Sequence, residues 1–367
     1  MIIMDVKIEN FYSFKNFHIN MSYPKRIVDS TIEGEYLEDR PNFRYKKVNI
    51  LMGGNATGKT SFGKMLMLFA NYCKDERKEW FLDVINDTAK PAALNIDFVT
   101  NENYLYRFSL SSIPKIGMEK QDSEISVHIF STEIGIKDNY ETCEKRLSES
   151  KGKRISIHEL DTRGWCFSYP ADARKHNWYH AIEDDPRYLQ ILECVLKTLD
   201  PSIQEVIKMK EVENTYAIKL EKKSVIIQNG KILDTEILSS GTKAGLDISY
   251  IIASLICDKH DLYYCDELFS YVYSDIEKAC LSILIDHLHG RKQLFFTTHN
   301  TDILDMQLPK HSFMFLKKGR GNEEGTIRCI YASDFLKRNT DSVKHAVEND
   351  LFSVIPDSDL LFEAAEL

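Results

Sequence analysis

The spacing of apolar residues in the first third of the chain predicts strands on either side of one glycine-rich loop. The stretch "IIMDVKIENFYSF" alternates well enough for a first strand. The short apolar run "KKVNILMG" ends in glycines, and "TSFGKMLMLFANYCK" has apolar residues at helical spacing. Residues 46–74 are therefore predicted to form a strand, a loop and a helix. Residues 93–111 are predicted to form a hairpin with "NEN" as its turn.

The rest of the chain changes character twice. Residues 115–185 are more polar and less periodic, which indicates an insertion of loops and helix ends. A helix is predicted next, capped by Asp185 and with Pro186 in its first turn. Residues 215–233 are predicted to be a strand pair with an "NG" turn. After residue 236 helices alternate with apolar strands, which is typical of a parallel sheet covered on both faces.

Composition places the chain among ordinary globular proteins. Its 367 residues can bury one large core or two modest ones. The net charge of −9 argues against a protein that coats DNA, although a local basic patch could still bind phosphates. The eight cysteines contain no CxxC spacing, which argues against a zinc site and suits a reducing compartment. The apolar runs are too short for a signal peptide or a membrane span, so we expect a cytoplasmic protein without a membrane partner.

One motif predicts a nucleotide site. "GGNATGKT" matches G-x-x-x-x-G-K-[ST] between a predicted strand and a predicted helix, which is the context that the motif requires. Glycines let backbone N–H groups close around phosphates, Lys59 would reach the β- and γ-phosphates of ATP, and the Thr60 hydroxyl would bind Mg²⁺. The predicted nucleotide-binding residues are Gly53, Gly54, Asn55, Ala56, Thr57, Gly58, Lys59, Thr60 and Ser61.

Two later apolar strands end in groups that can act on a bound nucleotide. "LYYCDE" ends in Asp266, which is predicted to hold Mg²⁺, and Glu267, which is predicted to polarise the attacking water or accept its proton. "LFFTTHN" brings His299 to the tip of a neighbouring strand, where it could touch the γ-phosphate. We therefore expect Glu267 and His299 to be the catalytic residues.

The stretch "LSSGT" carries no acid, base or metal ligand, so its meaning depends on its place among the other motifs. The order of phosphate loop, "LSSGT", "DE" and "TTH" resembles that of the ABC-type ATPases. In that family the corresponding signature loop, usually written LSGGQ, docks onto ATP held by the partner subunit of a dimer. The resemblance implies this role in trans for Ser239, Ser240, Gly241 and Thr242, and the alternative interpretation is a helix N-cap alone.

The start of the chain narrows the resemblance. "IENFYSFKNFHI" resembles the opening strand of the chromosome-maintenance and RecF-like branch, which argues against a transporter subunit. "GGNATGKT", with Ala56 in place of a third glycine, resembles the overcoming-lysogenization-defect and abortive-infection ATPases. The segments "SFMFLKKGRGNEEGTIRCIYASDF" and "AVENDLFSVIPDSD" resemble the end of stand-alone abortive-infection proteins. The resemblance covers residues 1–110 and 235–360.

Three features depart from those relatives. Tyr273 stands where many of them carry an acid or a histidine, with Asp275 two residues on, so communication between subunits is expected to differ. Gln121 is a weak candidate for the Q-loop glutamine. The stretch after His299 is too short for the Toprim nuclease domain of the overcoming-lysogenization-defect proteins. Any nuclease or toxin effector is therefore expected to be a separate polypeptide.

These observations predict an α/β protein with the ABC-type ATPase head, a P-loop NTPase fold. Its mixed, largely parallel sheet would be flanked by helices and accompanied by an antiparallel β lobe and a mainly helical insertion. The predicted segments are an N-terminal lobe (1–114), an insertion forming a partner or nucleic-acid surface (115–210), a C-terminal lobe (211–330) and a tail (331–367). The resemblance implies a homodimer or higher homo-oligomer that binds ATP and Mg²⁺ and hydrolyses ATP slowly, as a switch in prokaryotic defence against phage.

Two other functions stay open. One is a RecF-like DNA-repair ATPase that clamps duplex DNA, and the other is a scaffold that binds ATP without turnover. A nucleic-acid patch could be formed by basic residues with interleaved aromatic residues, although a solvated loop is the interpretation that such a charge run favours. These residues are Lys151, Lys153, Arg154, Arg163, Arg174 and Lys175, with Trp165, Phe167 and Tyr169.

Overall fold

The computed structural model describes residues 1–27, 30–100, 102–114, 124–169, 185–233, 238–319, 325–338, 340–354 and 359–365. The chain forms two compact units: unit 1 comprises Met1–Thr162 and Thr301–Leu367, and unit 2 comprises Arg163–Asn300. These boundaries differ from those of the four predicted segments, whose roles stay predictions. Among the described helices, none is both long and apolar enough to cross a lipid bilayer.

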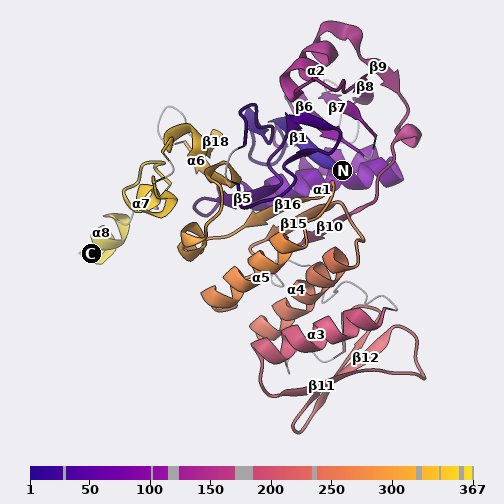
Figure 1. The fold of residues 1–367 in the computed structure, drawn as a ribbon, viewed down its shortest axis with the longest axis vertical. Helices are drawn as coiled ribbons and strands as arrows, with labels where there is room; N and C mark the ends of the chain where they lie inside the picture. The colour runs from indigo at the N-terminus through magenta and orange to yellow at the C-terminus, as the bar shows by residue number, and fades with distance from the viewer. Residues whose placement is uncertain are drawn as a thin grey trace. The chain divides into compact units, whose positions relative to one another are not determined.

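Unit 1 contains an antiparallel sheet whose strands run in the order β2-β1-β6-β7-β8-β9 (Figure 1). Its strands are β1 (Ile2–Glu9), β2 (Phe17–Asn20), β6 (Ala92–Val99), β7 (Tyr104–Ile113), β8 (Glu124–Glu133) and β9 (Lys153–Ile155). The pairing of β6 with β7 confirms the predicted hairpin. Strand β8 lies in the stretch predicted as loops and helix ends. Ile125, Val127 and Ile129 alternate with polar residues, but this alternation is short, ends at Phe130 and lies in a polar stretch, so the strand was not predicted.

The two faces of this sheet are covered by different elements. Helix α1 (Lys59–Asp75) packs on one face, where the Phe69 ring lies 5.1 Å from the rings of Phe98 and Phe108. Side chains of successive strand residues point to opposite faces of a sheet. Val99 and Leu105 therefore lie on the other face, in a second core cluster that includes Tyr140 of α2 (Tyr140–Arg146). The predicted helix after the glycine loop is thus confirmed, and it is anchored through aromatic side chains.

A second group of strands in unit 1 carries the glycine-rich loop. Strand β5 (Val48–Met52) is fully buried and runs parallel to β17 (Phe313–Lys318), which pairs antiparallel with β18 (Ile327–Tyr331). The remaining helices and strands of unit 1 are β3 (Tyr36–Leu37), β4 (Arg40–Arg44), η1 (Lys78–Val84), η3 (Leu147–Lys151), η4 (Ile157–Glu159), η6 (Thr301–Asp305), η7 (Lys310–Ser312), α6 (Ala332–Phe335), α7 (Val343–Glu348) and α8 (Asp359–Ala365).

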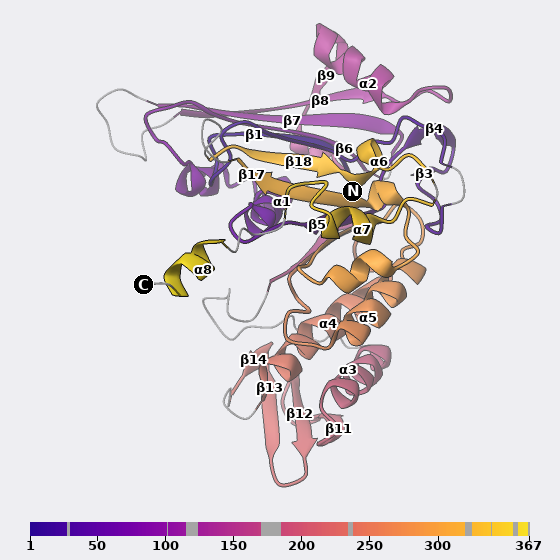
Figure 2. The same ribbon diagram turned by 90° about the vertical axis from the view of Figure 1, so that its left-hand side faces the viewer.

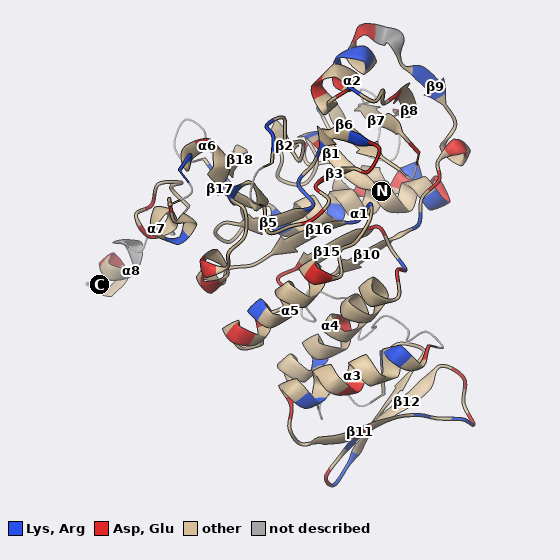
Figure 3. Cartoon of the chain, viewed as in Figure 1, with Lys and Arg blue, Asp and Glu red and all other residues tan. Residues whose placement is uncertain are grey.

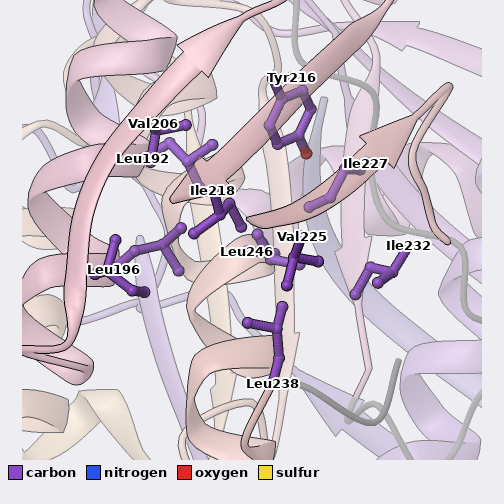
Figure 4. Packing of buried hydrophobic residues seen from close by; sticks show 11 residues of the cluster. Leu192, Leu196, Val206, Tyr216, Ile218, Val225, Ile227, Ile232, Leu238 and Leu246 are labelled. Carbon is purple, nitrogen blue, oxygen red and sulfur yellow. The ribbon is translucent and has the colours of Figure 1, made fainter. Parts of the chain in front are cut away.

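Unit 2 contains a small antiparallel sheet that packs on helices α3 (Pro186–Leu199) and α4 (Ser240–Ile256) (Figure 2). Its strands are β11 (Ile203–Lys208), β12 (Thr215–Leu220), β13 (Ser224–Gln228) and β14 (Lys231–Ile232). Figure 4 shows apolar side chains from strands and helices meeting between them. Asp185 caps α3 by accepting a hydrogen bond from the Arg187 N–H, as predicted. The "NG" turn joins β13 to β14, so the predicted strand pair is part of a longer meander.

The other strands of unit 2 form the predicted parallel arrangement. Strand β15 (Leu262–Asp266) lies between β10 (Trp165–Ser168) and β16 (Gln293–Thr297), and both pairings are parallel. Helix α4 precedes β15, and α5 (Ser274–Asp286) connects β15 to β16. All five residues of β15 and of β16 are buried, as expected for strands covered on both faces. The carboxyl ends of these two strands carry the candidate catalytic residues.

Candidate nucleotide-binding and hydrolysis site

The loop between β5 and α1 is closed so tightly that two of its glycines have no room for a side chain. Gly53 has a φ of 145°, and a Cβ there would lie 2.3 Å from the backbone oxygen of Leu316 in β17. Gly58 has a φ of 98° and lies against the ring of Phe14, with 2.9 Å to an added Cβ. These conformations and close approaches explain why the motif needs glycine at both of its fixed positions.

Lys59 is held at the centre of this loop. The residue is only 4% exposed, and its Nζ donates to the carbonyl oxygens of Gly53 at 2.9 Å and of Gly54 at 3.2 Å. The Thr57 hydroxyl also donates to the Gly54 oxygen, at 2.8 Å. The loop therefore holds the Lys59 ammonium group in its centre, beside the backbone that would surround a phosphate.

The loop has an exposed tip, whereas the helix turn that follows it is half-buried. Asn55 and Ala56 are exposed, and Ala56 has a φ of 59°, in the left-handed region where a glycine would be relaxed. Thr60 and Ser61 lie in the first turn of α1 and are half-buried. The first turn of a helix directs backbone N–H groups and positive potential outward, which favours an anion.

The two acids at the end of β15 are oriented by one hydroxyl on β16. Asp266 is paired with Thr297 in the strand register, and the Thr297 hydroxyl donates to Asp266 Oδ1 at 2.8 Å. The same hydroxyl accepts from the backbone N–H of Glu267 at 2.9 Å. Asp266 is 1% exposed. Burial raises the pKa of the neighbouring Cys265 thiol, so that thiol stays neutral. The strand end therefore presents a carboxylate fixed in direction.

Glu267 and His299 contact each other directly. His299 Nε2 lies 2.8 Å from Glu267 Oε1, and both side chains are partly exposed, by 41% and 26%. Glu267 has a φ of 47°, a strained conformation for a residue with a side chain, which is typical of functional sites. The two residues predicted to be catalytic thus form one acid–base pair at adjacent strand ends.

Sequence reasoning did not identify the residues that support this pair. Glu277, in the first turn of α5, is 4% exposed and accepts hydrogen bonds from Thr298 and Asn300, the two neighbours of His299. Ser274 also accepts from the Asn300 side chain, at 2.9 Å. The polar run "TTHN" after a strand of apolar residues was the available signal, together with an acid on the buried side of α5.

The signature residues start helix α4, and two of them make the N-cap. Ser239 Oγ accepts from the Thr242 N–H at 3.1 Å and lies 2.7 Å from the Thr242 hydroxyl. The N-cap interpretation is therefore confirmed as part of their role, and their predicted contact in trans stays a prediction. Ser240 is exposed at the helix start, and an added Cβ on Gly241 would lie 3.0 Å from the carbonyl oxygen of Tyr271.

The remaining sequence candidates fall in different environments. Tyr273 is 83% exposed and precedes α5, so it extends from the loop that follows Glu267. Phe167 is buried in β10 and stacks on Tyr264, which removes it from the aromatic set proposed for nucleic acid. Arg163 pairs with Asp258 at 3.1 Å. Gln121, Arg174 and Lys175 lie outside the described residues.

The structure therefore groups the predicted site residues into two sets. The phosphate loop lies in unit 1, whereas Asp266, Glu267, His299 and the signature lie in unit 2. Over the described residues, no three His, Cys, Asp or Glu side chains converge as a metal cage.

Comparison with known proteins gives the fold. No family model and no curated protein matches the chain. An SMC head bound to the C-winged helix domain of ScpA matches with a TM-score of 0.54 and 12% identity, over 95% of this chain and 100% of that one. An SMC head domain from Thermotoga maritima gives 0.42 and 12%, over 90% and 99%. An Smc head domain with an extended coiled coil, bound to the C-terminal domain of ScpA and derived from Pyrococcus furiosus, gives 0.49 and 11%, over 96% and 99%. The first match carries the conclusion: the chain has the α/β fold of an ABC-type ATPase head, with mixed sheets flanked by helices, as predicted.

Proposed function

We propose that this chain is a Mg²⁺-dependent ATPase that works as a dimeric switch. The observation that carries the proposal is the pairing of Glu267 with His299 at 2.8 Å, beside an Asp266 fixed by Thr297. In an ABC-type head such a strand edge is where hydrolytic groups belong, because ligands bind at the carboxyl ends of parallel strands. The closed, lysine-centred loop of unit 1 supports the same function, since it matches the chemistry of a polyphosphate.

In this proposal each group has one task. Lys59 and the backbone of the loop hold the β- and γ-phosphates of ATP. Glu267 accepts a proton from the attacking water, whose oxygen bonds to the γ-phosphorus as the bond to the bridging oxygen breaks and ADP leaves with that electron pair. His299 holds the Glu267 carboxylate in position and faces the transferred phosphoryl group.

The residues fit Mg²⁺ by their chemistry. The Thr60 hydroxyl and the Asp266 carboxylate are hard oxygen ligands of the kind that Mg²⁺ prefers. Bound Mg²⁺ would neutralise charge on the β- and γ-phosphate oxygens. The hydrogen bond from Thr297 fixes the direction of the Asp266 carboxyl group, as hydrogen-bond partners of metal ligands usually do.

The proposed switch operates between two copies of the chain. The exposed start of α4, with Ser240 and Gly241, would complete the site of a partner copy, and hydrolysis would reopen the dimer. We propose further that the dimer regulates a separate effector, such as a nuclease or toxin, in defence against phage in the cytoplasm. The resemblance of the phosphate loop and of the chain's end supports this role. The matched SMC heads include two bound to domains of ScpA, so heads of this fold can carry a separate protein partner.

Charge gives limited support to the alternative of a DNA clamp. Within the described part of unit 2, basic and acidic residues are interspersed along α3, and α5 carries one lysine among three acids (Figure 3). A surface that follows a phosphate backbone requires basic residues gathered in one place. We therefore favour a protein effector.

Two experiments test the proposal. The first measures phosphate release from ATP with Mg²⁺ by the purified chain, with Lys59→Ala as the control that should not bind ATP. Unchanged ATP after long incubation with the wild type would indicate a scaffold without turnover. The second purifies tagged Glu267→Gln protein with ATP and Mg²⁺ after expression with its native neighbouring genes. A stoichiometric nuclease-like or toxin-like protein supports the defence role, whereas DNA alone or repair proteins would indicate the clamp.

A further inference from the structure

The neighbours of His299 are tied to a single buried carboxylate. The Thr298 hydroxyl donates to Glu277 Oε1 at 2.6 Å, and the Asn300 side-chain amide donates to Glu277 Oε2 at 2.7 Å. Both carboxylate oxygens of Glu277 are therefore used by the two residues that flank His299. Glu277 and Thr298 are each 4% exposed, so these bonds are shielded from water and correspondingly strong.

The Thr298 hydroxyl also closes the turn of backbone around His299. The Thr298 hydroxyl that donates to Glu277 also accepts from the backbone N–H of Asn300, at 2.9 Å. His299 thus lies at the apex of a turn whose two sides are pinned. Its own side chain is 41% exposed, so packing alone does not fix its direction. The hydrogen bonds of its neighbours supply that constraint.

The same turn of α5 follows the short loop that begins after Glu267. The loop from Leu268 to Tyr273 joins Glu267 to α5, and its buried members anchor it, with Phe269 stacked on Phe296 at 5.2 Å. Asn300 donates to Ser274, the first residue of α5, as well as to Glu277. The first turn of α5 therefore holds the neighbours of His299, whereas Glu267 is held through its backbone by Thr297.

We propose that Glu277 is a positioning residue for hydrolysis, which acts by holding His299 against Glu267. This inference rests on the proposed ATPase function and deepens it by adding a residue that touches neither substrate nor metal. A buried carboxylate is costly to desolvate unless hydrogen bonds compensate for the lost water. Its two donors here come from both sides of a single histidine, which a role in packing alone would not require.

The test is a double-mutant cycle in steady-state ATPase kinetics. Glu277→Ala should lower kcat by about 10- to 100-fold, because it releases the turn that holds His299, and should leave the KM for ATP nearly unchanged. Glu277→Gln keeps an acceptor for Thr298 and should restore kcat to within about threefold of wild type. In a His299→Ala background, adding Glu277→Ala should cause no further loss, because Glu277 acts through the histidine.

Controls separate positioning from stability. Leu284→Ala removes a buried side chain from the same helix and should destabilise the fold, yet it should preserve kcat at temperatures well below its unfolding transition. If Glu277→Ala fails to fold, Thr298→Val is the substitute, because it is nearly isosteric and removes one donor. It should lower kcat by about threefold or more, again without effect in the His299→Ala background.

The outcomes distinguish the two levels of the account. The positioning role is supported if Glu277→Ala lowers kcat in the wild type but not in the His299→Ala background, and if Glu277→Gln restores kcat. If Glu277→Ala lowers kcat in the His299→Ala background as much as it does in the wild type, this inference is overturned and the ATPase proposal stays intact. The same holds if Glu277→Ala changes only the KM for ATP. Absence of turnover by the wild type would overturn the proposed function and this inference together.

Discussion

His299 Nε2 and Glu267 Oε1 lie 2.8 Å apart, although 31 residues separate the two in the chain. The contact exists because β15 and β16 are parallel neighbours whose carboxyl ends meet at one edge. It is partly exposed, so water can reach both groups. An acid–base pair in this place can activate a water molecule.

Replacing Glu267 by glutamine should stop hydrolysis and preserve nucleotide binding. The amide keeps the shape of the carboxylate and its contact with His299, but it cannot accept a proton from water. We expect kcat to fall by about 100-fold or more, with nucleotide affinity nearly unchanged. Phosphate release and fluorescent-nucleotide titration measure the two quantities separately. Hydrolysis at the wild-type rate would show that another group is the base.

The two adjacent glycines of the phosphate loop should respond differently to alanine. A Cβ on Gly53 would meet the Leu316 backbone oxygen at 2.3 Å, whereas an added Cβ on Gly54 has nothing within 4 Å. Gly53→Ala should therefore lower the free energy of unfolding by about 3 kcal/mol, and Gly54→Ala should change it by less than about 0.5 kcal/mol. Urea unfolding of both variants provides the comparison. Equal effects would contradict the described loop geometry.

Thr297 should control how the ATPase activity depends on the Mg²⁺ concentration. Its hydroxyl orients Asp266 and also receives the Glu267 N–H. Thr297→Val removes that hydroxyl at nearly constant volume and should raise the Mg²⁺ concentration for half-maximal ATPase activity by about tenfold. Thr297→Ser keeps the hydroxyl and is the matched control. A metal dependence that is unchanged in the valine variant would mean that Asp266 needs no such support.

Lys46 should give the stability of the protein a distinct pH dependence. The residue is 4% exposed, its Nζ donates to the Asn20 carbonyl and lies over the Tyr331 ring, and burial lowers its pKa from 10.5 to about 8. Below pH 8 both folded and unfolded chains hold the proton, so the cost of burying the charge is fully present. Between about pH 8 and 10.5 the unfolded chain holds more protons, so the contribution of Lys46 to the unfolding free energy rises with pH.

The measurement for Lys46 is a comparison with Lys46→Met, which keeps a long apolar stem. Tyrosines and cysteines away from Lys46 act on both proteins alike and cancel in the difference. Cys329 feels the Lys46 charge, but burial raises the pKa of its thiol to about 12, above the range compared. The wild type should gain stability relative to the variant as pH rises from 8 to 10. A difference that stays constant over this range would show that Lys46 titrates normally.

Sequence reasoning located the residues that touch the nucleotide site more readily than those that support them. Lys59, Glu267 and His299 stand at fixed places in motifs whose spacing reflects chemistry. Glu277 acts through Thr298 and Asn300 across 21 and 23 residues, a relationship that only the folded chain reveals. Its position on the buried side of α5 made it resemble an ordinary helix residue.

Some elements of the fold could likewise be predicted from local sequence and others could not. Strands with strong apolar runs, such as β15 and β16, and helices with clear caps, such as α3, were predictable from local pattern. Strand β8 was not predicted, because the alternation of Ile125, Val127 and Ile129 with polar residues is short and lies in a polar stretch. The three-stranded course of residues 215–232 was also missed, since the "EKK" turn between β12 and β13 carries no glycine. Pairing in these places is decided by the neighbouring strand and not by the segment itself.

The central claim is that the signature of one copy completes the site of another, and mixing two inactive proteins tests it most directly. Ser240→Arg blocks the signature of its own chain, and Glu267→Gln removes the base from its own site. In a mixed dimer one site keeps both an intact base and an intact signature. Random pairing should therefore restore about a quarter of wild-type phosphate release, because half of the dimers are mixed and each has one intact site. Phosphate release that stays at the level of the separate variants, in dimers shown to exchange subunits, would contradict the account.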